Sequence, residues 1–329
     1  MTADGGNRLG GSVPVAAAAV LWGTVGPAQL LADTGVSPVS LGACRMLLGG
    51  LVLGLCTARP PGLRTLRHPA ARGWTAVGIL VTVAFQICFL EAVERMGAAL
   101  ATAVAFGSVP VVSGLCARQF MRERLTANWW CSTACSVAGI ALLLVPGAAA
   151  RAELPGVLLG IGAGAAFGLY ITATKRLARC GADTTAAAPV SVLGAGLLVS
   201  PWLLVAPDGL ATPRALLLIG WLALGTTALG YLLFTRGVTR ISAATTGTLS
   251  LGEPLVATVL GIALLGERPT VPAALGAALL LGGLVVVSLP ARGSRYRRPA
   301  PPAVESGGIR SRSTASIASG SSGVRNGRT

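Results

Sequence analysis

Apolar residues along this chain gather in long runs that are separated by short polar connections. Ten runs approach the length of about 20 residues that a helix needs to cross a hydrocarbon layer of about 30 Å. They cover approximately residues 13–32, 38–57, 74–92, 98–117, 128–146, 155–175, 186–206, 213–235, 243–264 and 271–289. The pattern predicts an all-α polytopic membrane protein with ten transmembrane helices.

The composition favours the same class. Of the 329 residues, 53% are hydrophobic and only 11% are charged, whereas a soluble domain has about 25% charged residues. A surface with so little charge would not stay in water. The composition therefore excludes a soluble enzyme, a disordered protein and a secreted disulfide scaffold.

The net charge of +15 comes from basic residues that fall mainly between the apolar runs. This distribution favours anionic lipid headgroups as the partner, and we expect no nucleic-acid partner. With the N-terminus inside, 13 basic residues before the tail lie in cytoplasmic segments, against four in outer loops. The positive-inside rule then predicts a multi-pass protein of the plasma (inner) membrane with both termini cytoplasmic. The seven cysteines form no metal-binding pattern, and we expect no metal and no cofactor.

The two halves of the chain match at an offset of 144 or 145 residues. Gly23 matches Gly168, Phe89 matches Phe234, and the segment 123–126 matches 267–270. Each half holds five predicted helices, and an odd number inverts the second copy relative to the first. We therefore predict two inverted five-helix repeats with these boundaries: a cytoplasmic N-terminus at 1–12, repeats at 13–147 and 155–290, and a disordered basic cytoplasmic tail at 291–329.

Four segments resemble a known family when they are taken together and in order. They read AVLWGTVGPAQLL at 19–31, SLGACRMLLGGLVLGL at 40–55, RERLTANWWCSTACSVAGIALLL at 122–144 and LSLGEPLVATVLGIALLGERPT at 249–270. Over residues 13–290 the chain resembles the EamA-type transporters of the drug/metabolite transporter (DMT) superfamily. The resemblance implies ten helices around a central cavity and efflux of amino acids, their derivatives or other small metabolites, coupled to an ion gradient or by exchange.

Ionisable side chains inside the membrane are costly, and each is a candidate for function. Glu253 lies about ten residues into the predicted ninth helix, and Pro254 beside it bends that helix and frees a carbonyl. Glu253 is suited to a substrate amine, a cation or a coupling proton, or to one structural hydrogen bond at the bend. Arg45, in the second helix, is suited to a substrate carboxylate, to an ion pair or to snorkelling toward the surface.

Amphipathic and polar side chains also lie well inside the predicted helices. Aromatic walls with a few fixed donors are typical of a small-molecule cavity. Packing in the core of the bundle is the alternative for each of them. The candidates for the cavity are Trp22, Gln86, Tyr170 and Tyr231.

A matched pair of turns precedes the fifth and tenth predicted helices. Glu123 and Glu267 each stand three residues before a threonine, Thr126 and Thr270, that is placed to cap the next helix. The carboxylates would lie near positive helix ends. A structural role in the turn is favoured, and gating is the alternative.

These observations favour a secondary active transporter, an exporter of a small polar metabolite such as an amino acid or derivative, that works by alternating access around a midplane cavity. A coupling proton or ion is a further expected partner. The alternatives are a membrane-embedded enzyme of lipid metabolism and a non-transporting scaffold. The chain has one histidine and no clustered acid–base constellation, which argues against an enzyme. The pattern GxxxxGK[ST] is absent, which argues against direct drive by ATP.

Overall fold

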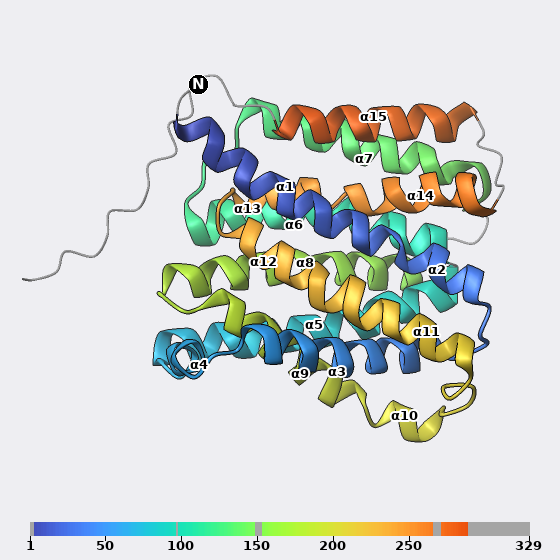
Figure 1. Cartoon of the computed structure of the whole chain (residues 1–329). Coiled ribbons are helices and arrows are strands. Elements are labelled where there is room, and N and C mark those ends of the chain that lie inside the picture. Colours follow the sequence, from blue (N-terminus) through green and yellow to red (C-terminus); the bar gives the residue numbers. More distant parts are fainter. Residues whose placement is uncertain (1–2, 97, 149–152, 266–270, 289–329) are drawn as a thin grey trace, which may run out of the picture. The chain divides into compact units, whose positions relative to one another are not determined.

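The computed structural model describes residues 3–96, 98–148, 153–265 and 271–288. Glu267, Thr270 and the predicted tail lie outside these residues. All regular elements in the described part are helices (Figure 1). They are α1 Ala3–Gly23, α2 Val25–Ala32, α3 Pro38–Thr57, α4 Pro60–Leu66, α5 Pro69–Met96, α6 Ala98–Met121, α7 Ala127–Ala148, α8 Leu154–Arg179, α9 Thr184–Val199, α10 Trp202–Val205, α11 Pro213–Trp221, the π-helix η2 Leu222–Leu229, α12 Gly230–Val238, α13 Ala243–Leu249, α14 Gly252–Leu265 and α15 Val271–Ser288.

Eight helical stretches within the described ranges are long and apolar enough to cross a membrane. The helices α7 and α15, where the sequence predicts the fifth and tenth spans, are not among the eight, although α15 contains the apolar stretch Ala274–Val287. The all-helical multi-span class is confirmed. The predicted number of ten spans is not confirmed.

Three of the predicted spans are not continuous α-helices. The first divides at Thr24 into α1 and α2, the eighth contains the π-helix η2, and the ninth divides at residues 250–251 into α13 and α14. Glu253 still lies ten residues after the start of the ninth span, Ala243–Leu264, but the span is interrupted just before it rather than bent at Pro254. Glu253 is the second residue of α14, and Pro254 is the third, where a helix does not need its missing N–H.

Close helix crossings recur between matched positions of the two halves. A methyl group on Gly23 would come within 2.6 Å of Val256, and one on Gly168 within 2.9 Å of Val112. Because Gly23 and Gly168 are 145 residues apart and Val112 and Val256 are 144 apart, these are the same contact made twice. Each contact joins one half of the chain to the other, as a two-repeat architecture requires.

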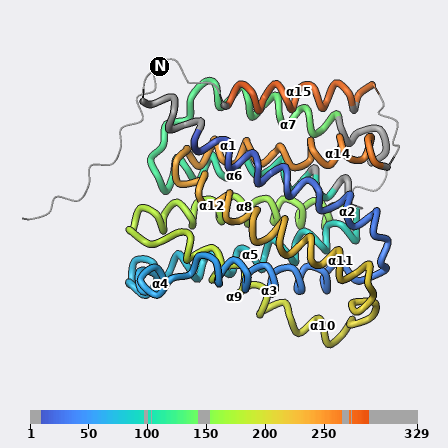
Figure 2. Tube along the Cα trace, in the orientation of Figure 1, coloured from blue at the N-terminus to red at the C-terminus, as the bar shows by residue number. Residues whose placement is uncertain are grey.

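The pair α7 and α15 forms a second such crossing, and Figures 1 and 2 show the two helices side by side. A methyl on Gly139 would lie 2.8 Å from the backbone nitrogen of Leu280, and one on Gly283 would lie 3.2 Å from that of Ser136. The two backbones approach closely because glycine occupies the crossing on both helices. Small residues are what allows this packing in lipid.

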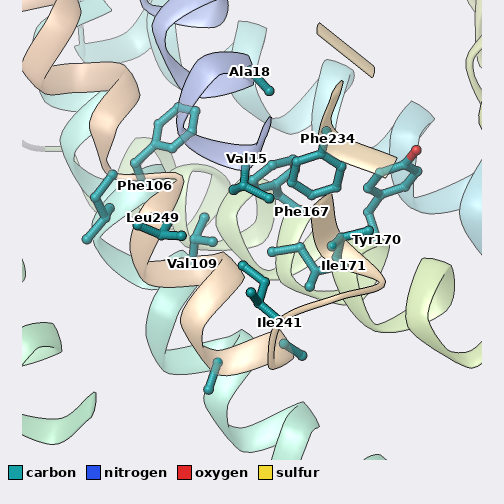
Figure 3. Close-up of a cluster of buried hydrophobic side chains, with 14 of the residues drawn as sticks. Val15, Ala18, Phe106, Val109, Phe167, Tyr170, Ile171, Phe234, Ile241 and Leu249 are labelled. Atoms are coloured by element: carbon teal, nitrogen blue, oxygen red, sulfur yellow. The ribbon is translucent and has the colours of Figure 1, made fainter. Parts of the chain in front are cut away.

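The largest buried cluster lies where α1, α6, α8, α12 and α13 meet (Figure 3). Phe167 and Phe234 have ring centroids 5.9 Å apart, and Val15 and Val109 are almost fully buried beside them. This cluster supports one wall of the cavity described below, because Phe167 and Tyr170 belong to both.

Candidate functional site

A cavity of about 130 Å³ lies between the described helices. Its lining includes all six side chains that the sequence proposes for a cavity, and these come from both halves of the chain: Trp22, Arg45, Gln86, Tyr170, Tyr231 and Glu253. At one end the lining reaches Gln29 in α2, Pro38 at the start of α3 and Leu90 near the end of α5. The cavity therefore extends toward the connection between the first two spans.

Aromatic rings form much of the wall. Trp22 meets Tyr231 edge to face at a centroid distance of 5.5 Å and meets Phe167 at 5.8 Å. Tyr170 and Tyr231 are 5.8 Å apart, also edge to face. Such contacts fix the rings by their quadrupoles as well as by the area they bury. The wall is largely apolar, and Tyr170 and Tyr231 add a hydroxyl group each.

Four lining phenylalanines were not among the sequence candidates. Phe85 stacks on Phe89 at 5.5 Å, and Phe106 lies 6.2 Å from Phe167. The internal repeat carries the signal that could have found two of them, because Phe167 matches Trp22 and Phe89 matches the core residue Phe234. No comparable pattern distinguishes Phe85 or Phe106 from ordinary apolar residues.

The π-helix η2 places Tyr231 and receives a hydrogen bond from Trp22. The Trp22 indole Nε1 donates to the backbone oxygen of Thr226 at 2.9 Å. The hydroxyls of Thr226 and Thr227 both donate to the oxygen of Leu222, at 2.7 and 2.8 Å. Three side chains thus donate to two carbonyls of the π-helix. The irregular backbone is thus held in place next to the cavity.

Two opposite charges face this cavity. Arg45 projects from the middle of α3, and Glu253 lies in the first turn of α14, where the positive end of the helix favours a carboxylate. No direct ion pair joins Arg45 to Glu253 in the described part of the chain. Both side chains are therefore available to a charged ligand.

The break beside Glu253 lies against the break of the first span. Gly23, the last residue of α1, packs so closely on α14 that a methyl there would lie 2.7 Å from the backbone oxygen of Glu253. The nitrogen of Glu253 donates to the oxygen of Ser250 at 3.1 Å, which closes the turn between α13 and α14. Two interrupted helices thus meet at the edge of the cavity.

Glu123 does not line the cavity. It follows the C-terminal end of α6, near the C-terminal end of α8. Its Oε2 accepts a hydrogen bond from the nitrogen of Ala243 at 3.1 Å, which places it at the start of α13 rather than of α7. Its Oε1 lies 3.8 Å from Lys175 Nζ and 3.8 Å from Arg179 Nη2. Thr126, before α7, accepts from the nitrogen of Trp129 at 3.2 Å, as an N-cap side chain does.

The fold and this cavity define a multi-span membrane protein with an internal cavity lined by aromatic, polar and charged side chains. A family model for EamA-like transporters matches the chain twice, over residues 10–145 and 154–289. The chain belongs to this family. Membership of this family supports the interpretation of the chain as a membrane transporter rather than an enzyme.

Known relatives agree with this assignment. The chain is 32% identical over 279 residues to the "Uncharacterized transporter YwfM" of Bacillus subtilis, covering 84% of this chain and 93% of that protein. It is 27% identical over 288 residues to a "Probable terminal-alkyne amino-acid exporter" of Streptantibioticus cattleyicolor, covering 86% and 94%. A solved crystal structure superposes with a TM-score of 0.72 at 23% identity, over 84% of this chain and 95% of that one, and shows the same fold.

Proposed function

We propose that the protein is a secondary active transporter that exports a small amino acid or amino-acid derivative across the plasma membrane. The observation that carries the proposal is the pair of opposite charges, Arg45 and Glu253, that face one cavity without being joined to each other. A zwitterion carries two charges of the complementary signs. The exporter of Streptantibioticus cattleyicolor, which is similar to this chain over most of its length, supports the substrate class and the direction.

In this proposal each charge has one task. The Arg45 guanidinium binds the carboxylate of the solute with its fork of N–H donors. Glu253 binds the ammonium group, or carries the coupling proton when no amine is bound. The aromatic wall around Trp22 and Tyr231 contacts the apolar part of the solute. The Arg45 and Glu253 positions match Val190 and Val109 in the other repeat, so each charge occurs once.

Alternating access supplies the transport step. The two five-helix repeats, ten spans in all, rock around the cavity, and both termini face the cytoplasm. The cavity extends toward the connection between the first two spans, which is outside in this orientation. The interrupted helices at Thr24 and at residues 250–251 give the repeats points at which to bend without breaking a regular hydrogen-bond ladder.

Counterflow in proteoliposomes tests the proposal. Purified protein is reconstituted with an internal pool of unlabelled amino acids, and uptake of each labelled amino acid is followed with and without a pH gradient and without ATP. We expect at least one amino acid to accumulate above the level in protein-free liposomes. Accumulation that requires ATP, or none for any amino acid, would contradict the function. Labelling of tags on the two termini in intact cells tests the orientation, which is wrong if either tag is reached from outside.

A further inference from the structure

Gln86 is a buried amide that lines the cavity without a hydrogen-bond partner among the described residues. The residue is only 4% exposed, and no hydrogen bond joins its amide to another part of the described chain. A buried amide normally has a partner, because leaving its donors unpaired is costly. Gln29, which also lines the cavity, follows the usual pattern, since its Nε2 donates to the backbone oxygen of Val25 at 3.3 Å.

Gly42 holds the Gln86 amide beside Arg45. A methyl on Gly42 would overlap the Nε2 atom of Gln86, so the amide occupies the space where any other residue would have its Cβ. Gly42 and Arg45 are three residues apart on α3 and therefore share one face of that helix. The amide N–H donors and the guanidinium are thus neighbours on the same side of the cavity.

We propose that Gln86 is a specificity-determining residue that donates a hydrogen bond to the solute's carboxylate, next to the Arg45 guanidinium. The proposal rests on the proposed function and names how one end of the solute is recognised. Arg45 alone attracts any anion, whereas a second donor at a fixed place favours a planar carboxylate with two acceptor oxygens. The site then prefers an amino acid to the amine that lacks its carboxylate.

Isothermal titration calorimetry on the purified full-length protein tests this proposal with two matched pairs of probes. The pairs are L-phenylalanine with 2-phenylethylamine, and L-leucine with 3-methylbutylamine. Gln86→Met keeps the length of the side chain and removes its donors, so we expect the affinity for the amino acids to fall about tenfold and that for the amines to stay. Gly42→Ala should act in the same way by displacing the amide. Gln29→Met, the control, should affect both members of a pair equally.

The outcomes separate the two proposals. If the wild-type protein binds an amino acid and Gln86→Met binds it equally well, or loses acid and amine alike, the role of Gln86 is wrong and the proposed function stands. If the wild-type protein binds neither amino acid and transports none in the counterflow assay, the substrate class is wrong and the carboxylate site falls with it.

A second inference comes from the charged cluster around Glu123, which is independent of the cavity. The Glu123 and Lys175 side chains are only 9% and 4% exposed. Lys175 Nζ also donates to the backbone oxygens of Val238, at 3.4 Å, and of Ile241. Buried charges of this kind are stable only when they are paired, and removing one partner leaves the other uncompensated.

This cluster joins the two halves of the chain at the ends of the helices. Glu123 follows α6 of the first half, whereas Lys175 and Arg179 end α8 and Ala243 begins α13 of the second half. The helix α6 runs back across the bundle after α5. The C-terminal end of α6 therefore lies on the other side of the bundle from Leu90, where the cavity ends near the connection between the first two spans. The contact therefore closes the side on which the described cavity does not extend.

The geometry points to a latch between Glu123 and Lys175 with Arg179, which holds this side shut and must separate when the cavity opens here. The Oε1 atom of Glu123 has no hydrogen-bond partner and is held by charge alone, at 3.8 Å from each cation. Such a contact can open by a rigid movement of one half without unwinding a helix. Loss of the Glu123 charge then favours the state that is open on this side.

Cys116 provides a native reporter beneath the latch. It is 8% exposed and interacts with Thr172, one turn before Lys175. In a variant that keeps Cys116 and has the other six cysteines replaced by alanine, labelling by N-ethylmaleimide is followed in native membranes. We expect Glu123→Gln to raise the labelling rate about tenfold and Arg179→Gln, whose side chain is 33% exposed and more tolerant, to raise it less.

Glu153→Gln is the matched control, because Glu153 precedes α8 at its other end and is exposed. It should leave the labelling rate unchanged. The latch is wrong if neither Glu123→Gln nor Arg179→Gln changes the rate. It is also wrong if Glu153→Gln raises the rate as much, since the increase would then reflect general loosening of the bundle.

Discussion

Arg45 and Glu253 face the same cavity from opposite halves of the chain and are not joined by an ion pair within the described residues. Two opposite charges in one low-dielectric space attract strongly, and a structural pair would be in contact. Because they are not paired with each other, both are open to a solute that carries two opposite charges in the function proposed above. This relationship is the basis of the transport function proposed above.

Arg45 should matter for affinity through its planar fork of donors. Replacing it by methionine removes the carboxylate partner, and we expect KM for the transported amino acid to rise by at least about tenfold, because hydrogen bonds to charged groups contribute about 1.5–3 kcal/mol. Arg45→Lys keeps the charge and should be intermediate. Arg214→Met, on the exposed start of α11, should leave KM unchanged. An Arg45→Met variant with the parent's KM would remove Arg45 from the site.

Gly23 should be needed for the crossing of the first and ninth spans. A methyl there would meet Val256 at 2.6 Å and the oxygen of Glu253 at 2.7 Å. We expect Gly23→Ala to lower the free energy of unfolding by about 1–3 kcal/mol, as overpacking does, and to lower the thermal unfolding temperature in detergent. Gly26→Ala, with no atom within 4 Å of the added methyl, should be neutral or slightly stabilising. Equal melting temperatures for the two variants would show that this crossing is not tight.

The glycine pair Gly282 and Gly283 offers a test of the crossing between α7 and α15. A methyl on Gly283 would lie 2.8 Å from the backbone oxygen of Ser132, whereas a methyl on Gly282 would meet nothing within 4 Å. Gly283→Ala should therefore separate the two helices and lower thermal stability by about 1–3 kcal/mol, and Gly282→Ala should not. The two variants differ by one position in one helix, so the comparison cancels the effect of helix propensity. The reverse order of stabilities would contradict the packing.

Trp22 should hold the π-helix in place. Trp22→Phe keeps a ring in the wall and removes the hydrogen bond to Thr226, which costs about 1 kcal/mol and frees a buried carbonyl. We expect faster hydrogen exchange in η2, measured by mass spectrometry, and reduced transport. Trp202→Phe, at a half-exposed residue of α10, is the control. Unchanged exchange in η2 would show that the Trp22 indole does not stabilise it.

The sequence predicts the class of fold well and the continuity of individual helices poorly. Long apolar runs alone identify membrane spans, because lipid tolerates little else. The same runs continue across Thr24 and across residues 250–251, so hydropathy does not reveal that the helices break there. The π turn at η2 depends on the Thr226 and Thr227 hydroxyls, which a sequence pattern does not distinguish from ordinary polar residues.

The candidate site, too, is predicted by the sequence only in part. Charged and aromatic residues are conspicuous in an apolar span, and the six candidates do meet at one cavity, although their roles stay predictions. The partners of Glu123 lie 52 and 120 residues further along the chain, and only the tertiary fold brings Lys175 and Ala243 to it. The orientation of the Gln86 amide against Gly42 has no sequence signal for the same reason.

Flux through the Glu253→Gln variant is the sharpest test of the zwitterion site. The protein and the variant are reconstituted in proteoliposomes, and transport of the amino acid found by counterflow is measured over a range of pH, with Glu94→Gln, an exposed residue near the end of α5, as the control. We expect Glu253→Gln to lose transport driven by a pH gradient or to lose affinity for the amine, and Glu94→Gln to behave as the parent. Transport by Glu253→Gln at the parent's rate over the whole pH range would contradict the role of this carboxylate and, with it, the zwitterion site.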